Sequence, residues 1–138
     1  MNRELFDQVI EDLEHLGYVK RIGKKLLVKK EFFDQIERTI PVFILYSLAN
    51  NPRSVERFSR ALWNDRDLEV VLYSTAISMV LADMSIEKKR LGIRDYNMFK
   101  KDYAEAVGSV VIKLLNMVAP EKERLLKSIR KAIMNALS

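Results

Sequence analysis

The chain contains no cysteine, one histidine and only four glycines among its 138 residues. The lack of cysteine excludes disulfide bonds, thiol nucleophiles and cysteine-ligated zinc. The glycines are isolated singles, so no glycine-rich loop is present to cradle a phosphate group. Glutamine occurs only at Gln8 and Gln35, while lysine, arginine and glutamate are abundant. This composition favours a thermophilic source.

The side chains that catalysis usually needs do not form a set in this sequence. His15 shares a helical face with Glu11 and Asp12, but a zinc site requires a fuller and better separated group of ligands. A serine–histidine–acid arrangement would have to use His15, and no serine lies in a strained nucleophile turn. The carboxylate pair Asp83 and Glu87 fits a solvated helix face. We therefore expect a non-enzymatic protein with no catalytic residues, no metal and no cofactor.

Composition indicates one globular domain over residues 1–138. Apolar residues make up 49% of the chain and charged residues 31%, which is enough apolar material for a single core. The first residues, MNRELFDQVIEDLE, are too charged for a secretory signal. A cytoplasmic location is expected.

The most apolar stretch runs from Leu68 to Ile86 and predicts the central helix. Its apolar residues fall on two helical stripes, so this helix needs neighbours on both sides. A membrane span is not expected, because the uncharged run from Val70 to Ala82 is shorter than the roughly 20 residues that a span needs. Asp65 is the predicted N-cap, and Gly92 is the predicted residue that follows the last turn.

Apolar spacing, prolines and glycines predict the other elements. The expected elements are an amphipathic helix over 2–16 ended by Gly17, a basic β-hairpin over 18–30 that turns at Gly23, a helical segment over 31–50, a helix from Pro52 to about Trp63, a helix from an Asp95 cap to about Val118, and a last helix that begins at Pro120. The predicted fold is mainly α, a bundle of four principal helices over 31–138, with an N-terminal helix and a short basic β-hairpin over 1–30.

Pro41 lies inside the helical segment 31–50. Proline lacks a backbone donor and disfavours helical geometry at the residue before it, here Ile40. We expect a kink or a break at this position, and the pattern leaves open whether the segment is one kinked helix or two.

Apolar residues exceed what a small bundle covers. The central helix and the helix ending near Val118 each carry a second apolar stripe, and the stretch after Pro41 is apolar on nearly all sides. A large unpaired apolar patch is unusual on a monomer, so we expect a homodimer. Trp63 suits either core packing or an interface anchor. The candidate interface residues are Phe43, Tyr46, Trp63, Ile77, Leu81, Val111 and Leu115.

The net charge of +5 is concentrated in two segments. Residues 17–30 carry six cations and no acid, and the last helix is also basic. Such segments are either solvated faces or contacts for an anionic partner, with DNA or RNA first among these. The candidate nucleic-acid contacts are Lys20, Arg21, Lys24, Lys25, Lys29, Lys127, Arg130 and Lys131.

Residues 3–30, RELFDQVIEDLEHLGYVKRIGKKLLVKK, resemble the second half of a winged helix-turn-helix domain. In that family a helix ending in a Leu-Gly-Tyr-Val type of junction leads into a hairpin wing; the helix enters the major groove and the wing contacts phosphates. The resemblance places Arg3 and Gln8 on the recognition helix and Lys20, Arg21, Lys24 and Lys25 in or near the wing. The chain departs from the family in lacking the two preceding helices and in having an acidic helix. As a whole it resembles small, cysteine-free helical proteins of hyperthermophilic archaea and their viruses or plasmids.

Two functions follow from these patterns. The first is a helical-bundle protein that mediates protein–protein interaction as a homodimer or with another protein, and it rests on the surplus of apolar surface. The alternative is a nucleic-acid-binding regulator or accessory subunit that uses the basic hairpin and the basic last helix. No membrane partner is expected.

Overall fold

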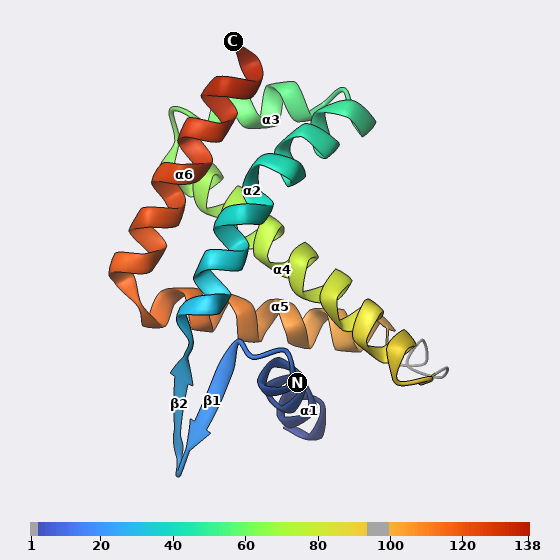
Figure 1. Cartoon of the computed structure of the whole chain (residues 1–138). Helices are drawn as coiled ribbons and strands as arrows, with labels where there is room; N and C mark the ends of the chain where they lie inside the picture. Colours follow the sequence, from blue (N-terminus) through green and yellow to red (C-terminus); the bar gives the residue numbers. More distant parts are fainter. Residues whose placement is uncertain (1–2, 94–99) are drawn as a thin grey trace.

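The computed structural model describes residues 3–93 and 100–138. These residues form helices and one hairpin, and the coarse prediction of a mainly α fold with a short β-hairpin is confirmed (Figure 1). The elements are α1 (Arg3–His15), β1 (Val19–Ile22), β2 (Lys25–Val28), α2 (Lys30–Asn50), α3 (Ser54–Ala61), α4 (Asp65–Arg90), α5 (Lys100–Met117) and α6 (Ala119–Leu137). The predicted cap Asp95 lies outside the described residues.

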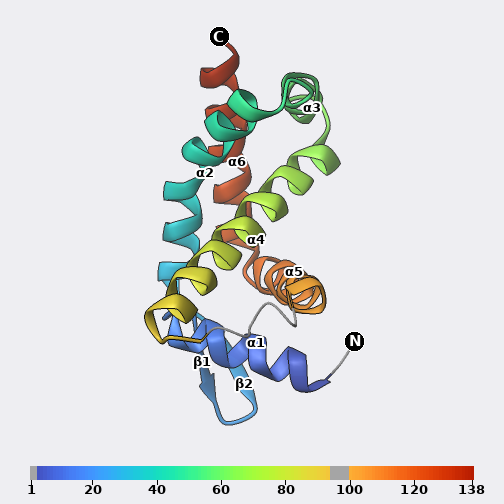
Figure 2. The ribbon, with the colours of Figure 1, turned by 90° about the vertical axis from the view of Figure 1, so that its right-hand side faces the viewer.

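The helices do not all run side by side. Helices α2 and α6 lie next to each other and run in the same direction, and α4 crosses them diagonally (Figures 1 and 2). Helix α5 lies across one end of this group, roughly perpendicular to α2 and α6, and α3 covers the opposite end. Helix α1 packs on α5, and the hairpin extends beyond them at that same end. The hairpin and α3 are therefore at opposite ends of the molecule.

Helix α4 is the central helix, as predicted. It contacts α2, α3, α5 and α6, and its fully buried residues include Leu72, Ala76 and Val80. Of the described helices, α4 alone is long and apolar enough by composition to cross a membrane. The core helix of a globular domain has the same composition, and eight residues of α4 are buried against its neighbours. On one of the two predicted stripes burial ends at Met79, because Ala82 and Ile86 are exposed, whereas Met84 on the other stripe is buried.

Local hydrogen bonds fix where α4 begins and ends. The N-cap is Asn64 rather than the predicted Asp65: the Asn64 side chain accepts hydrogen bonds from the backbone N–H groups of Arg66 and Asp67 at 3.0 and 3.2 Å. The prediction for the other end is confirmed. Gly92 has a φ of +73°, where a residue without Cβ is not strained, and its N–H donates to the carbonyl of Lys89.

Helix α2 passes through Pro41 without a break. Of the two alternatives, one kinked helix or two helices, the structure shows the first: residues 30–50 form one helix that bends in its middle (Figures 1 and 2). Pro41 itself faces solvent, while Ile36, Ile40 and Ile44 on the opposite side are buried. Burial of these three side chains on both sides of the proline holds the two halves of the helix together. The carbonyl of Glu37 is the one that loses its helical donor.

Helix α1 and the hairpin form a small unit at the end of the core. Val9, Ile10 and Leu13 are buried, and α1 packs on α5 through this side. Gly17 ends the helix with a φ of +80°, and the next residue, Tyr18, is buried at the base of the hairpin. The strands pair antiparallel from Val19↔Val28 to Ile22↔Lys25, so the predicted hairpin and its turn at Gly23 are confirmed.

Candidate functional site

The hairpin has two faces of different character. The pairs Val19↔Val28 and Arg21↔Leu26 lie on one face, and the pairs Lys20↔Leu27 and Ile22↔Lys25 lie on the other, because side chains alternate along a strand. We call this second face the outer face of the hairpin. Ile22 is 55% exposed and Leu27 is 51% exposed, so the outer face presents aliphatic and cationic side chains alternately.

The other face anchors the hairpin to the body of the molecule. Val19 is buried, and the guanidinium of Arg21 donates to a carboxylate oxygen of Glu14 on α1 at 3.0 Å. Hydrogen bonds from the backbone N–H and then from the side chain of Arg21 lower the pKa of Glu14. Arg21 was predicted to contact an anionic partner, but in this structure an acid of the same chain already holds it.

Three of the predicted hairpin cations are free. Lys20, Lys24 and Lys25 are exposed, and none of them forms an ion pair with another residue in the part of the chain that the structure describes. Lys29 is half-buried where β2 leads into α2. The hairpin projects from the end of the molecule, so these ammonium groups can be reached from several directions (Figures 1 and 2). They concentrate positive charge on a narrow element.

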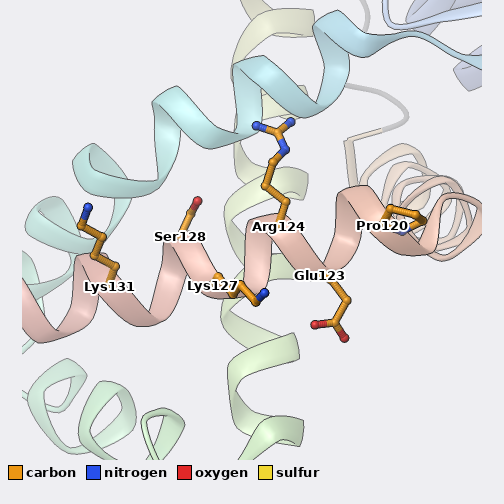
Figure 3. Close-up of a pocket in the computed structure, with 6 residues that line it drawn as sticks. All are labelled: Pro120, Glu123, Arg124, Lys127, Ser128 and Lys131. Carbon is orange, nitrogen blue, oxygen red and sulfur yellow. The ribbon is translucent and has the colours of Figure 1, made fainter.

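The predicted cations of α6 lie elsewhere and are partly neutralised. Arg130 forms an ion pair with Asp65 on α4 at 3.1 Å, whereas Lys127 and Lys131 are exposed. Lys127 and Lys131 line a hollow on α6 together with Glu123, Arg124, Ser128 and Pro120 (Figure 3). Helix α6 leads away from the hairpin toward α3 (Figure 1). The structure therefore does not bring the two predicted basic segments together.

One cation of this hollow, Arg124, is held by ion pairs within the protein. Arg124 points toward α2 (Figure 3), where it bonds to Glu37 at 2.6 Å and to Asp34 at 3.3 Å, and it also pairs with Glu121. These carboxylates raise the pKa of Arg124, chiefly through the hydrogen bond to Glu121. The cluster ties α6 to α2, and it leaves Glu123, Lys127 and Lys131 as the charged residues of the hollow that form no ion pair within residues 3–93 and 100–138.

A second groove, of about 570 Å³, lies between α4 and α6. Lys122 crosses it and donates to Glu69 at 2.6 Å, to the hydroxyl of Tyr73 at 3.0 Å and to Asn116 at 2.6 Å. Burial disfavours the charge on Lys122, but the hydrogen bonds outweigh it and raise its pKa. The Lys122 ammonium has three acceptors within its own chain. The polar groups in this groove therefore form a structural hydrogen-bond network.

The predicted interface residues divide into two groups. Val111 and Leu115 are fully buried in the chain's own core, and they offer no surface to a partner. Ile77 is partly buried and packs toward Gly108 of α5. Phe43 and Leu81 are partly buried against the core. Only Tyr46, 67% exposed, and Trp63, 90% exposed, are presented to solvent, so core packing of Trp63 is excluded.

Exposed apolar residues also occur at positions that the sequence reading did not select. Val42 and Leu45 are 66% and 59% exposed, and their spacing places them beside Tyr46 on one side of α2. We call Val42, Leu45 and Tyr46 the outer stripe of α2. Lys20 and Ile22 on one strand, and Lys25 and Leu27 on the other, are spaced two residues apart, and this spacing could have predicted the outer face of the hairpin from the sequence. The outer stripe of α2 had no such signal, because nearly every residue from Val42 to Ala49 is apolar.

No group of three or more histidine, aspartate or glutamate side chains within residues 3–93 and 100–138 is placed to hold a metal ion. Comparisons with protein-family models, with curated proteins and with solved structures gave no match to this chain. The chemistry of the exposed surface is therefore the basis for the function.

Proposed function

We propose that this protein binds the phosphate backbone of duplex nucleic acid through the hairpin β1–β2. The observation that carries the proposal is the group of three exposed ammonium groups on Lys20, Lys24 and Lys25, on a hairpin that extends beyond the body of the molecule. Phosphate contacts of this kind give affinity without requiring base readout. Ile22 and Leu27 would lie against the sugar edges between the phosphates that the lysines contact.

The resemblance to a winged domain supports the hairpin and not the helix. Helix α1 uses Val9, Ile10 and Leu13 to pack on α5, and its exposed side includes the acids Asp7 and Glu11. These carboxylates would repel phosphates. We therefore assign no groove contact to α1, and we propose that the hairpin acts without a recognition helix.

The test is fluorescence anisotropy of a labelled random duplex at low and at higher salt. We expect micromolar binding that weakens steeply with salt, as counterion release requires. In the variant Lys20→Glu, Lys24→Glu, Lys25→Glu, the affinity at low salt should fall at least about tenfold. The slope of log K against log salt should decrease by about one for each lysine that contacts a phosphate.

A matched control separates the hairpin from net charge. The variant Lys101→Glu, Lys127→Glu, Lys131→Glu changes the net charge by the same amount, and its three lysines are exposed on α5 and α6. It should keep most of the affinity of the parent. Equal binding by the parent and the hairpin variant, or equal losses in the hairpin variant and the control, would rule out the hairpin as the site.

A second candidate function is protein–protein interaction as a homodimer, and a specific observation favours it. The outer stripe of α2 exposes three large side chains within an uncharged segment, residues 39–52. Two copies of a chain with net charge +5 would meet there without bringing like charges together. Dimerisation and the binding of nucleic acid use different surfaces and are compatible.

A further inference from the structure

The corner between α3 and α4 combines an exposed aromatic ring with free arginines. Trp63 is 90% exposed, more than any of the other large apolar side chains that the structure describes. A tryptophan normally buries a large area in a core or an interface, so an open indole leaves a substantial apolar surface in water. The corner lies at the opposite end of the molecule from the hairpin (Figures 1 and 2).

The backbone of the corner is fixed, although the ring is open. The N–H of Leu62 donates to the carbonyl of Phe58, and the N–H of Trp63 donates to the carbonyl of Arg60 at 3.0 Å. Asn64 then caps α4. Phe58 before the corner and Leu68 after it are buried in the core. The indole is thus presented from a rigid support, which lowers the entropy lost when a ligand stacks on it.

Exposed arginines lie on both sides of Trp63 in the sequence. Arg53, Arg57 and Arg60 follow one another at helical spacing along the exposed side of α3, and Arg66 lies in the first turn of α4. None of the four forms an ion pair within residues 3–93 and 100–138. The acids nearby are Glu56, Asp65 and Asp67, and of these Asp65 is paired with Arg130.

We infer that this corner binds single-stranded nucleic acid, with a base stacked on Trp63 and phosphates held by Arg57, Arg60 and Arg66. A guanidinium group can donate two parallel hydrogen bonds to the oxygens of one phosphate, and an aromatic ring can stack on any nucleic-acid base. A duplex hides the faces of its bases, so it would leave the indole without a partner. A membrane surface is disfavoured, because Trp63 is accompanied on α3 and the first turns of α4 only by two half-exposed valines, Val55 and Val70. This inference does not rest on the hairpin.

The experiment uses Trp63 as its own reporter, since it is the only tryptophan in the chain. An oligothymidylate of about 15 nucleotides, the size that single-strand-binding modules cover, is titrated into the full chain at low salt. Stacking should quench the tryptophan fluorescence in a saturable manner that salt reverses. The variant Trp63→Ala, followed by anisotropy of a labelled oligonucleotide, should lose about tenfold in affinity, and Trp63→Phe should recover most of the loss.

Two controls make the result decisive. Ile86→Ala removes another large apolar side chain, which is 67% exposed on α4, and should bind as the parent does, and the variant Lys20→Glu, Lys24→Glu, Lys25→Glu should still show the quenching. Failure of the hairpin proposal therefore leaves this one standing, and the reverse also holds. Absence of quenching at low salt, or unchanged affinity of Trp63→Ala, would overturn the inference. A blue shift of Trp63 with vesicles of phosphatidylcholine and phosphatidylserine, without an effect of the oligonucleotide, would overturn it in favour of a lipid surface.

Discussion

Two buried tyrosine hydroxyls connect elements far apart in the sequence. Tyr103 on α5 donates to Asp12 on α1 at 2.7 Å, and Tyr18 at the base of the hairpin donates to Asp83 on α4 at 2.5 Å. Lys88 lies 3.6 Å from Asp12 and over the ring of Tyr103. Burial, followed by the hydrogen bond to a carboxylate, raises the pKa of both tyrosines well above the ordinary value. These contacts join α1 and the hairpin to the core.

The raised pKa values predict a loss of stability in alkali. Because the folded state keeps these protons more tightly than the unfolded state, their stabilisation is complete below about pH 10 and declines as the pH rises further. Tyr103→Phe should lower the free energy of unfolding at neutral pH by about 1–2 kcal/mol, since Asp12 loses a donor. It should also weaken the decline above pH 10. Urea denaturation at several pH values measures both effects.

Tyr46→Phe is the control for this prediction, because its hydroxyl is exposed. The control should match the parent at every pH. A Tyr103→Phe variant that declines above pH 10 as steeply as the parent would show that Tyr103 is not one of the groups that cause the alkaline loss.

At the scale of single residues, the sequence predicted the helix ends and turns better than it predicted the solvent exposure of side chains. Gly17 and Gly92 end their helices as expected, because a left-handed residue after a helix favours glycine. Asn64 and Asp65 are adjacent and are equally favoured as caps, and the prediction of Asp65 chose the wrong one of the two. The exposure of Trp63 depends on where α3 ends, which a shift of a single residue changes.

Among the elements, α2 gives the clearest prediction. Pro41 lies in the interior of a continuous helix, faces solvent and leaves the carbonyl of Glu37 without its helical donor. Pro41→Ala restores the donor and removes the clash, so the free energy of unfolding should rise by about 1 kcal/mol or more. Chemical denaturation measures this change. Ala49→Pro, a proline near the end of the same helix, should instead destabilise; a destabilised Pro41→Ala variant would mean that the core requires the bend.

The second apolar stripe of α5 shows why helix faces are hard to assign from sequence. Helix α1 covers part of α5, and Ile77 of α4 packs against another part of it near Gly108. Val111 and Leu115 are therefore buried within one chain, although their pattern suggested a partner. Periodicity identifies a face that must be covered, but it does not identify the element that covers it.

For the whole molecule, the oligomeric state depends on the outer stripe of α2. If two copies associate there, analytical ultracentrifugation at micromolar concentration should give twice the mass of one chain. Leu45→Glu should then give a monomer without loss of stability, because Leu45 is 59% exposed. Met134→Glu, at a comparably exposed position on α6, should leave the mass unchanged. A parent that sediments as a single chain at this concentration would contradict the second candidate function.

The arrangement of the whole molecule was the part least accessible from sequence. Helix positions and the hairpin followed from local patterns, whereas the perpendicular placement of α5 and the parallel pairing of α2 with α6 depend on contacts between distant segments. Whether the basic hairpin and the basic last helix lie close together also depends on contacts between distant segments. The structure places them apart because α6 runs from the hairpin end toward α3.

The separation of the hairpin from the α3–α4 corner would affect how many copies of the protein act together on nucleic acid. Helix α4 alone spans about 39 Å, from the rise of 1.5 Å per residue over its 26 residues. If the proposed surfaces at both ends bind nucleic acid, the molecule would be a divalent cross-linker. When the number of protein ends is close to the number of binding sites on the nucleic acid, the protein would join separate strands into a network. In excess, each strand would be saturated by molecules bound at one end only, and the network would dissolve.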